Sequence, residues 1–361
     1  MQQHKLVEII NNFLINGEFV SSKSHGNGHI NDTFLISTTS EKYILQKINH
    51  KIFKNVDNLN KNIIKALDHF NKKQKENPAI KNFIEPGIIF CKNGDNHFKD
   101  KEGDFWRLMN FIPDSTSIEV AENPETAFEA AKAFGYFQNK IIDLKPDDFF
   151  STIKDFHNLD MRMKSFYRVL EKNTKNRNQF ASEEIEFVKS HEYLNNKLKE
   201  LLESDQIPIR VTHNDTKINN VLLDKNTMKG ISVIDLDTIM PGTILFDFGD
   251  MVRTFTSPAE EDEKDLSKVI FRLEIFKAMA KGYLSQLKDS LTKTEIDYLV
   301  FGGKLMTFMI GLRFLTDFLD GDLYFKTKRK NHNLDRCKTQ FKLLKEMENI
   351  DDVLQRIIKE I

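Results

Sequence analysis

The segment that most constrains this chain is a polar loop, residues 213–220, set inside a block of strand-forming residues from Ile207 to Asp237. The loop reads His-Asn-Asp-Thr-Lys-Ile-Asn-Asn and is followed by an apolar run, a turn and a second apolar run. Two such runs around a turn predict a hairpin, which returns Asp235 to the side of Asn220. Several functional groups are therefore expected to meet in one small region.

The residue types in this region match the requirements of phosphoryl transfer to a hydroxyl group, which depends on positioning and charge neutralisation. Asp215 can act on the attacking hydroxyl, and Lys217 can reach the transferring phosphate as a point charge. Asn220 and Asp235 supply the hard oxygen ligands that Mg²⁺ prefers. The combined pattern predicts a kinase that uses ATP and Mg²⁺. The alternative is a plain β-turn loop in which Asp and Asn serve as turn formers.

The order of predicted elements favours an α+β fold with two lobes, as does a length of 361 residues. Strands are predicted at residues 19–24, 30–37, 42–48, 87–91 and 104–111, and helices at 56–77, 124–142, 161–171, 182–204 and 298–319. We expect a small β-rich N-lobe over residues 1–110. A larger, mainly helical C-lobe, residues 111–361, would carry the β-hairpin beside the polar loop, with a ligand cleft between the lobes.

Composition excludes several other classes of protein. A net charge of −1 gives no basic surplus for nucleic acid, and no run of 18 apolar residues predicts a membrane span. The N-terminus lacks the apolar segment of a signal peptide. Two cysteines, Cys91 and Cys337, cannot form a disulfide framework or a four-ligand zinc site. We expect a cytoplasmic protein with reduced thiols and a small-molecule substrate, and no pattern predicts its oligomeric state.

Residues 213–220 and 233–242 resemble signature segments of the aminoglycoside phosphotransferase and choline kinase superfamily, which is related to the protein kinases. The resemblance is closer still to the N-acetylhexosamine 1-kinases. Three further segments agree, at residues 26–33, 43–49 and 311–325, so the matches extend over nearly the whole chain. The resemblance implies a protein-kinase-like fold. It also implies ATP-dependent phosphorylation of GlcNAc or GalNAc at the anomeric hydroxyl, giving the sugar 1-phosphate.

The resemblance also implies roles for individual residues. Asp215 would be the catalytic base or the orienting group for the sugar hydroxyl, with Asn220 and Asp235 as magnesium ligands. The hinge that bonds adenine would consist of Met109, Asn110, Phe111 and Ile112. The sugar site would be lined by His29, Asp215, Arg313 and Tyr324.

Several assignments in the N-lobe have alternatives. Gly26 and Gly28 fit a turn whose backbone N–H groups cover phosphate, but an Asn-Gly pair is also an ordinary hairpin turn. His29 beside them is either a sugar ligand or a surface histidine. In the third strand Gln46 and Lys47 point to opposite faces, so only one can face the nucleotide. We assign Lys47 to nucleotide binding, although no acid lies between Asp57 and Asp68 to pair with it.

The C-lobe assignments have alternatives as well. Arg313 is one helical turn from Asp317, so an ion pair between them competes with a role in sugar binding. Asp237 is either a second metal ligand or a supporting residue. Asp247 is expected to support the polar loop through hydrogen bonds to its backbone. For the whole protein, the alternatives are a kinase of choline, an amino alcohol or an aminoglycoside, and a pseudokinase that binds nucleotide without turnover.

Overall fold

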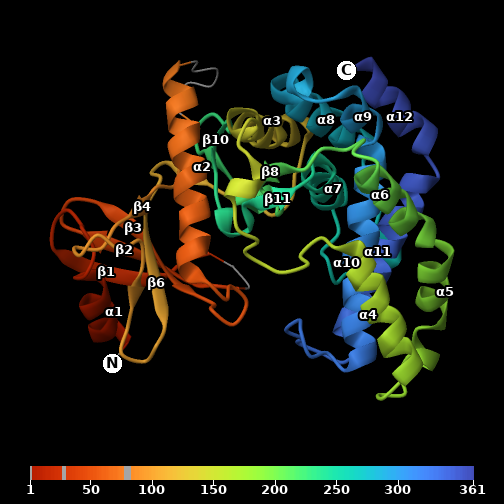
Figure 1. The fold of residues 1–361 in the computed structure, drawn as a ribbon, viewed down its shortest axis with the longest axis horizontal. Coiled ribbons are helices and arrows are strands. Elements are labelled where there is room, and N and C mark those ends of the chain that lie inside the picture. Colours follow the sequence, from red (N-terminus) through yellow and green to blue (C-terminus); the bar gives the residue numbers. More distant parts are fainter. Residues whose placement is uncertain (1, 27–29, 77–82) are drawn as a thin grey trace.

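The structure, a computed structural model, describes residues 2–26, 30–76 and 83–361. Figure 1 shows a β-rich part at the N-terminal end and a larger helical part at the other end, with helix α2 (Val56–Glu76) between them. This arrangement confirms the predicted α+β fold with two lobes. The strand boundaries predicted at residues 19–24 and 42–48 agree with the structure at both ends.

The N-terminal sheet is antiparallel, with strand order β1-β2-β3-β6-β4 and β5 paired to β6. Its strands are β1 (Phe19–Ser24), β2 (Asp32–Thr38), β3 (Lys42–Ile48), β4 (Ile88–Ile89), β5 (Phe98–Lys99) and β6 (Phe105–Asn110). Alternate side chains such as Tyr43 and Leu45 pack against Phe13 and helix α1 (Gln2–Ile10). On the opposite face of β3, Ile44 and Gln46 are only half-buried.

Helix α2 packs mainly with the C-terminal part of the chain, although its Asn60 also bonds to Arg107 of the sheet. Its apolar stripe joins the larger of the two cores, where Phe70 stacks on Phe137 with ring centroids 5.6 Å apart. The Asn62 amide donates to the carbonyl oxygen of Ile239 at 2.9 Å. Contacts of this kind tie α2 to later residues, because one face of an amphipathic helix must be buried. The division of the chain at residue 110 stays a prediction.

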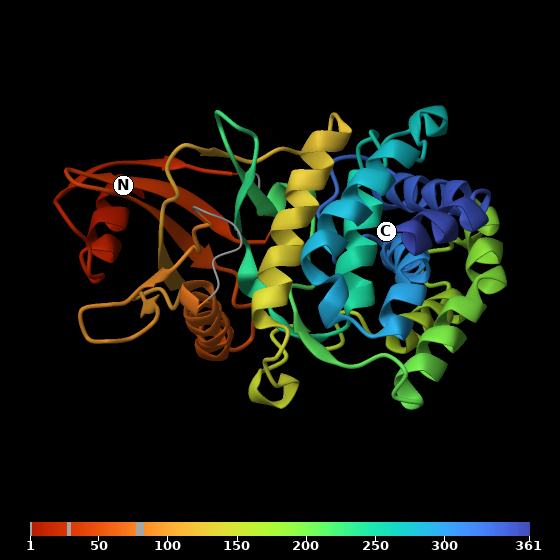
Figure 2. The same cartoon turned by 90° about the horizontal axis from the view of Figure 1, so that it is seen from above.

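The C-lobe is built around α10, which packs against α7, α11 and α4 (Figure 2). Its helices are α3 (Pro124–Ile141), α4 (Leu159–Lys172), α5 (Ser182–Ser190), α6 (Glu192–Glu203), α7 (Ile244–Phe255), α8 (Leu273–Leu287), α9 (Lys293–Asp297), α10 (Leu299–Asp320), α11 (His332–Glu348) and α12 (Asp351–Glu360). α10 is long and apolar enough to cross a membrane, but 78% of its apolar window is buried inside the protein. It is therefore the core helix of this lobe.

The predicted hairpin is confirmed. Strand β9 (Val221–Asp224) pairs with β10 (Gly230–Val233), with Val221 opposite Val233. Strand β7 (Ser115–Thr116) adds to the outer edge of β9. Strand β8 (Arg210–Thr212) pairs separately with β11 (Met240–Gly242), so the polar loop is held between two small sheets.

Two helix predictions were wrong in detail. The helix predicted over residues 182–204 breaks at His191, whose N–H bonds to the carbonyl oxygens of Phe187 and Val188. Ser182, which resembled a capping residue, is the first residue inside α5 and follows an Ala181 cap that makes no side-chain bond. Helix α7 was not predicted, because its residues alternate acidic and aromatic side chains that all become buried.

Candidate active site

Asp215 lies at the centre of the polar loop, directly after β8. The Asn220 amide donates to the Asp215 carbonyl oxygen at 2.8 Å and to its carboxylate Oδ2 at 3.2 Å. Lys217 Nζ lies 3.0 Å from the same Oδ2. The structure therefore brings Asp215, Lys217 and Asn220 together, and it leaves Asp215 Oδ1 without a hydrogen bond among the described residues.

The charges around Asp215 keep it ionised. Burial alone would raise the pKa of this carboxyl group, but the ammonium group of Lys217 outweighs that effect and holds the pKa below its ordinary value. Burial likewise lowers the pKa of Lys217, but Asp215 and Asp235 outweigh it and hold the pKa above the ordinary range. At neutral pH the two groups form an ion pair.

Asp247 on α7 fixes the backbone of the polar loop through two hydrogen bonds. The Asp247 carboxylate accepts hydrogen bonds from the N–H groups of His213 at 3.0 Å and Asn214 at 2.7 Å. Asn214 has a left-handed φ of 64°, and its amide donates to three backbone carbonyls. A Cβ at Gly242 would collide with that amide, so this position requires glycine. The predicted supporting role of Asp247 is confirmed.

His213 links the loop to the hairpin. Its Nδ1 accepts a hydrogen bond from the Asp215 N–H at 3.2 Å, so its Nε2 donates to the Ile234 carbonyl oxygen at 3.0 Å. The Ile234 N–H in turn bonds to the Asn220 carbonyl oxygen at 2.9 Å. These bonds place Asp235, the next residue, beside Asn220 as the sequence predicted.

Asp235 adopts a left-handed backbone with φ of 60° and reaches solvent, although protein surrounds it on several sides. This enclosure, together with the negative charges of Asp237 and Asp215, raises the pKa of Asp235 to about 7. Among the described residues its carboxylate accepts no hydrogen bond and forms no ion pair. A bound cation would relieve that accumulation of negative charge.

The oxygen atoms here suit a hard divalent cation. Asn220 uses its amide nitrogen for Asp215, so its Oδ1 stays available beside the Asp235 carboxylate. In the described ranges no three His, Cys, Asp or Glu side chains converge in a metal cage. Magnesium commonly takes one or two protein oxygens and completes its shell with phosphates and water, so two ligands are sufficient for it.

The third strand corrects the expected nucleotide contact. Lys47 points away from the loop and lies 2.6 Å from Asp104, an arrangement that argues against its predicted role. Gln46 faces the site and accepts a 2.6 Å hydrogen bond from Arg107 on β6. Arg107, which the sequence did not single out, also donates to Asn60 on α2 at 3.1 Å. Arg107, which is fully buried, therefore makes the contact with α2 on this face of the sheet that was expected of Lys47.

Asp237 joins the two lobes. Its Oδ1 lies 2.7 Å from Arg107, and its Oδ2 accepts a 2.7 Å hydrogen bond from the Asn31 amide. Both oxygens are engaged by residues of the N-terminal sheet. This geometry favours the supporting role of Asp237 over that of a second metal ligand.

The expected hinge, residues 109–112, lies at the end of β6. The N–H groups of Asn110 and Phe111 bond to Gly87 and Lys42. The N–H of Ile112 has no acceptor among the described residues and is free to donate to a ligand. Met109 is buried in the strand.

A hollow of about 350 Å³ lies beside the end of β1 and the start of β2. Gly26 adopts a φ of 75° there. The hollow is lined by Ser24, His25, Gly26, Asn31, Asp32, Thr33 and Phe34. Gly28 and His29, predicted to contact nucleotide and sugar, lie outside the described residues.

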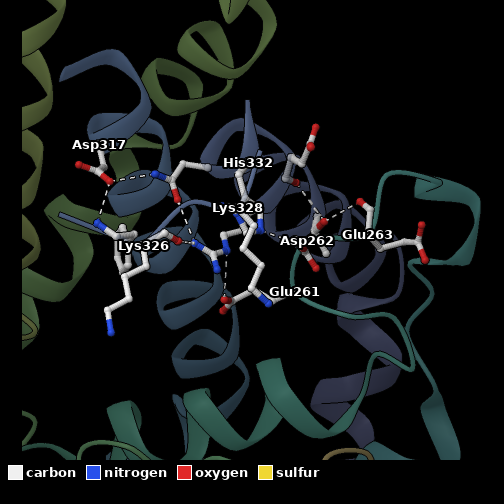
Figure 3. Close-up of polar contacts among 12 residues, drawn as sticks. Glu261, Asp262, Glu263, Asp317, Lys326, Lys328 and His332 are labelled. Carbon is white, nitrogen blue, oxygen red and sulfur yellow. Dashed lines mark hydrogen bonds and ion pairs between the residues drawn. The ribbon is translucent and has the colours of Figure 1, made fainter. Parts of the chain in front are cut away.

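Arg313 and Tyr324 meet on the far side of the loop. The guanidinium carbon of Arg313 lies 5.6 Å from the Phe156 ring, 5.9 Å from Tyr324 and 5.5 Å from Phe325. The alternative pairing of Arg313 with Asp317 was wrong. Asp317 instead accepts the N–H groups of Leu323, Tyr324 and Phe325, at 2.9, 2.8 and 3.0 Å, and the amide of Asn333. Figure 3 shows Asp317 within the polar network that holds the segment between α10 and α11.

The irregular segment before α4 adds residues that the sequence reasoning missed. His157 Nε2 donates to the Asn214 carbonyl oxygen at 3.0 Å, which places this segment beside the polar loop. Arg162 on α4 donates to the carbonyl oxygens of Asp155 and Phe156 at 3.1 and 3.2 Å. No local pattern marks either residue, because their relation to the loop arises only from packing.

Several solved structures share this fold. An aminoglycoside phosphotransferase from Alicyclobacillus acidocaldarius subsp. acidocaldarius DSM 446 has a TM-score of 0.64 at 9% identity, covering 98% of this chain and 96% of its own. A microcompartment-associated aminopropanol kinase has a TM-score of 0.63 at 13% identity, covering 98% of each chain. Spectinomycin phosphotransferase, solved with ADP and spectinomycin, has a TM-score of 0.56 at 15% identity, covering 99% of this chain and 98% of its own. At such identities these similarities show the fold alone.

The sequence itself matches a family model over the region that contains the loop, the hairpin and most of the sheet. The model is that of the phosphotransferase enzyme family, and it matches residues 22–267. Those residues include Asp215, Asn220 and Asp235, whose geometry suits phosphoryl transfer. This chain therefore belongs to the phosphotransferase enzyme family.

Proposed function

We infer that this phosphotransferase transfers the γ-phosphoryl group of ATP to the anomeric hydroxyl of an N-acetylhexosamine, GlcNAc or GalNAc, giving the sugar 1-phosphate. Phosphoryl transfer to a small-molecule alcohol follows from the family and from the loop geometry. The choice of sugar rests on the resemblance of the loop, hairpin and Arg313 segments to N-acetylhexosamine 1-kinases. Nucleotide use agrees with the ADP bound in the similar spectinomycin phosphotransferase.

The mechanism assigns one task to each residue of the loop. Asp215 Oδ1 faces the acceptor hydroxyl and takes its proton as the oxygen–phosphorus bond forms, while ADP leaves. Lys217 and Asn220 hold Asp215 Oδ2, so the free oxygen has a fixed orientation. Magnesium, when bound by Asn220 and Asp235, would neutralise phosphate charge. The Ile112 N–H is the hinge group available to adenine.

One observation argues against a cationic acceptor. Arg313 lies near the catalytic loop and has no carboxylate partner among the described residues. Burial lowers the pKa of Arg313, while Tyr324 and Asp215 act in the opposite direction. An ammonium group, as in the acceptor that names the similar aminopropanol kinase, would be repelled by this guanidinium. A sugar offers hydroxyl and amide oxygens to the same donors.

An ADP-release assay tests the proposal. Mg-ATP is supplied with GlcNAc, GalNAc, glucose, galactose, choline or kanamycin, and the acid lability of the product is measured. Turnover of the N-acetyl sugars to an acid-labile phosphate is expected. Turnover only of choline or kanamycin would reject the sugar assignment but keep the role of Asp215.

A further inference from the structure

Two arginines beside the acceptor side of the loop have no acidic partner. Neither Arg313 nor Arg162 forms an ion pair with an acid among the described residues. Asp317, the acid nearest to Arg313 in sequence, is occupied by four hydrogen bonds from other groups. The carboxylate Oδ2 of Asp215 is bonded to Lys217 and Asn220. Within the described ranges the two guanidinium groups thus have no bonded counter-ion, and Asp155 and Asp215 act on them only from a longer distance.

The two guanidinium groups share one neighbour, Phe156. Arg162 Nη2 bonds to the Phe156 carbonyl oxygen at 3.2 Å, and the Arg313 guanidinium carbon lies 5.6 Å from the Phe156 ring. The next residue, His157, is bonded to the Asn214 carbonyl oxygen, one residue before Asp215. Both arginines therefore lie in the region that a hydroxyl acceptor must enter to reach Asp215.

These groups retain free donors. Arg162 uses only Nη2 for the two backbone carbonyls, and its Nη1 is neither bonded nor buried in the described structure. For Arg313, any guanidinium nitrogen without a hydrogen bond is accessible to solvent, because none is buried without a partner. Burial and the charge of Arg313 lower the pKa of Arg162 to about 10 and outweigh the opposite effects of Tyr324 and Asp155.

Arg162 is not explained by packing alone. An arginine needed only to cap two carbonyls could be replaced by lysine, whereas a planar fork with free donors matches a carboxylate or phosphate group. The aromatic rings of Phe156, Tyr324 and Phe325 hold the second guanidinium in place. Placing two such forks together without an acid is unfavourable unless a ligand supplies negative charge.

We propose that Arg162 and Arg313 form a subsite for an anionic oxygen group, a carboxylate or a phosphate, carried by the acceptor. The proposal rests on the proposed function insofar as the acceptor is an N-acetylhexosamine, and it extends the acceptors to acidic derivatives of these sugars. The anionic group binds the arginines while a hydroxyl of the same molecule faces Asp215. The tyrosine and phenylalanine rings border the sugar between them.

Steady-state kinetics with Mg-ATP test the subsite on the full chain. The acceptors are GlcNAc, GlcNAc 6-phosphate, N-acetylglucosaminuronate, glucuronate and glucosamine. We expect kcat/KM for at least one N-acetylated acidic acceptor to exceed that for GlcNAc by about 10-fold or more, with glucosamine lowest. The two N-acetylated acids distinguish a phosphate from a carboxylate ligand.

Variants locate the effect. Arg162→Gln should lower kcat/KM for the preferred acid by about 10-fold or more and for GlcNAc by less than about 3-fold. Arg168→Gln is the matched control, because Arg168 is exposed on the same helix and bonds only to Ser165. Arg162→Lys, which keeps the charge, should retain part of the preference. Calorimetric binding of the acids to the nucleotide-free protein gives the same comparison where turnover is slow.

The outcomes separate the two hypotheses. Equal or better use of GlcNAc and glucosamine than of either acid would overturn the subsite, as would a uniform loss for all acceptors in Arg162→Gln. Turnover or binding of glucuronate without use of any N-acetylated sugar would reject the proposed function and still support the subsite.

Discussion

At the scale of single residues, the site depends on how charge is distributed around Asp215. One of its oxygens is held by Lys217 and Asn220, and the other is free. Asp235 is crowded by other acids and lacks a partner among the described residues. The two carboxylates thus differ in environment, and this difference matches the separate roles of a base and a metal ligand.

Replacing Asp215 by Asn should remove the base while keeping the side-chain shape. We expect kcat to fall by about 10²-fold or more, with little change in ATP affinity. Steady-state kinetics and nucleotide titration measure the two quantities. Asp289→Asn, on the exposed surface, is the control, and unaltered turnover in Asp215→Asn would contradict the assignment.

Asp235→Asn should raise the magnesium concentration needed for half-maximal turnover, because a neutral amide is a weaker ligand than a carboxylate. Turnover measured across a magnesium series gives this value. The same magnesium dependence in the variant and in the native protein would remove Asp235 from the metal site.

His157 should make stability depend on pH. Burial lowers its pKa to about 3, so the folded protein keeps this ring neutral while the unfolded chain binds a proton near pH 6.5. Its contribution to stability is therefore present above pH 6.5 and is lost as pH falls towards 3, by at most about 1.4 kcal/mol per pH unit.

A comparison of variants isolates this effect from other titrating groups. The free energy of unfolding of His157→Gln, measured by urea denaturation from pH 7 to 5, should fall less steeply than that of the native protein. His4→Gln is the control, because His4 is exposed on helix α1. Parallel curves for the native and His157→Gln proteins would show that the ring is protonated in both states.

At the scale of elements, one acid at the end of α10 arranges the loop that carries the acceptor-side rings. Asp317 binds three successive N–H groups of residues 323–325 through one carboxylate, much as a bound anion would. The neighbouring contacts of Asp262 with His332 and Arg329 fix the start of α11 (Figure 3). The loop therefore has no regular structure but a defined position.

Asp317→Asn should disturb that loop, since an amide offers one acceptor oxygen where the carboxylate offers two. We expect KM for the acceptor to rise by about 10-fold while KM for ATP is unchanged, because the loop is on the acceptor side alone. Asp320→Asn at the end of the same helix is the control. A change in both KM values would indicate a general loss of structure instead.

At the scale of the whole molecule, buried polar contacts join the lobes. Arg107 on β6 meets Asp237 after the hairpin at 2.7 Å, and Asn31 binds the other oxygen of Asp237. Helix α2 adds a shared apolar core and the bond from Asn62 to Ile239. The two parts of the chain are thus joined by a buried ion pair and by a helix that shares their core.

Asp237→Asn should leave the buried Arg107 without a counter-charge and lower the free energy of unfolding by about 3–5 kcal/mol. Chemical denaturation measures this loss. The double variant Arg107→Met with Asp237→Leu should recover much of it, because it removes both buried charges. Equal losses in the single and double variants would show that the pair is not the source of stability.

The local sequence determined much of the fold and the core of the site. The order of the elements, the hairpin and the meeting of Asp215, Lys217, Asn220 and Asp235 all depend on residues close together in the chain. The supporting role of Asp247 followed from the same reasoning. Periodicity and turn chemistry act over short distances, which is why these predictions were reliable.

Only the tertiary structure decided the contacts between distant segments. Three contacts each depend on which elements pack together: Arg107 bonds to Gln46, Asp317 bonds to a loop instead of Arg313, and Arg162 and Arg313 share Phe156 as a neighbour. A side chain's partner is set by geometry across the lobes, and residue spacing along one strand or helix offers only the nearest candidate. The partners of the charged side chains are therefore determined only by the folded chain, whereas the residue types and spacing of the polar loop are given by the sequence.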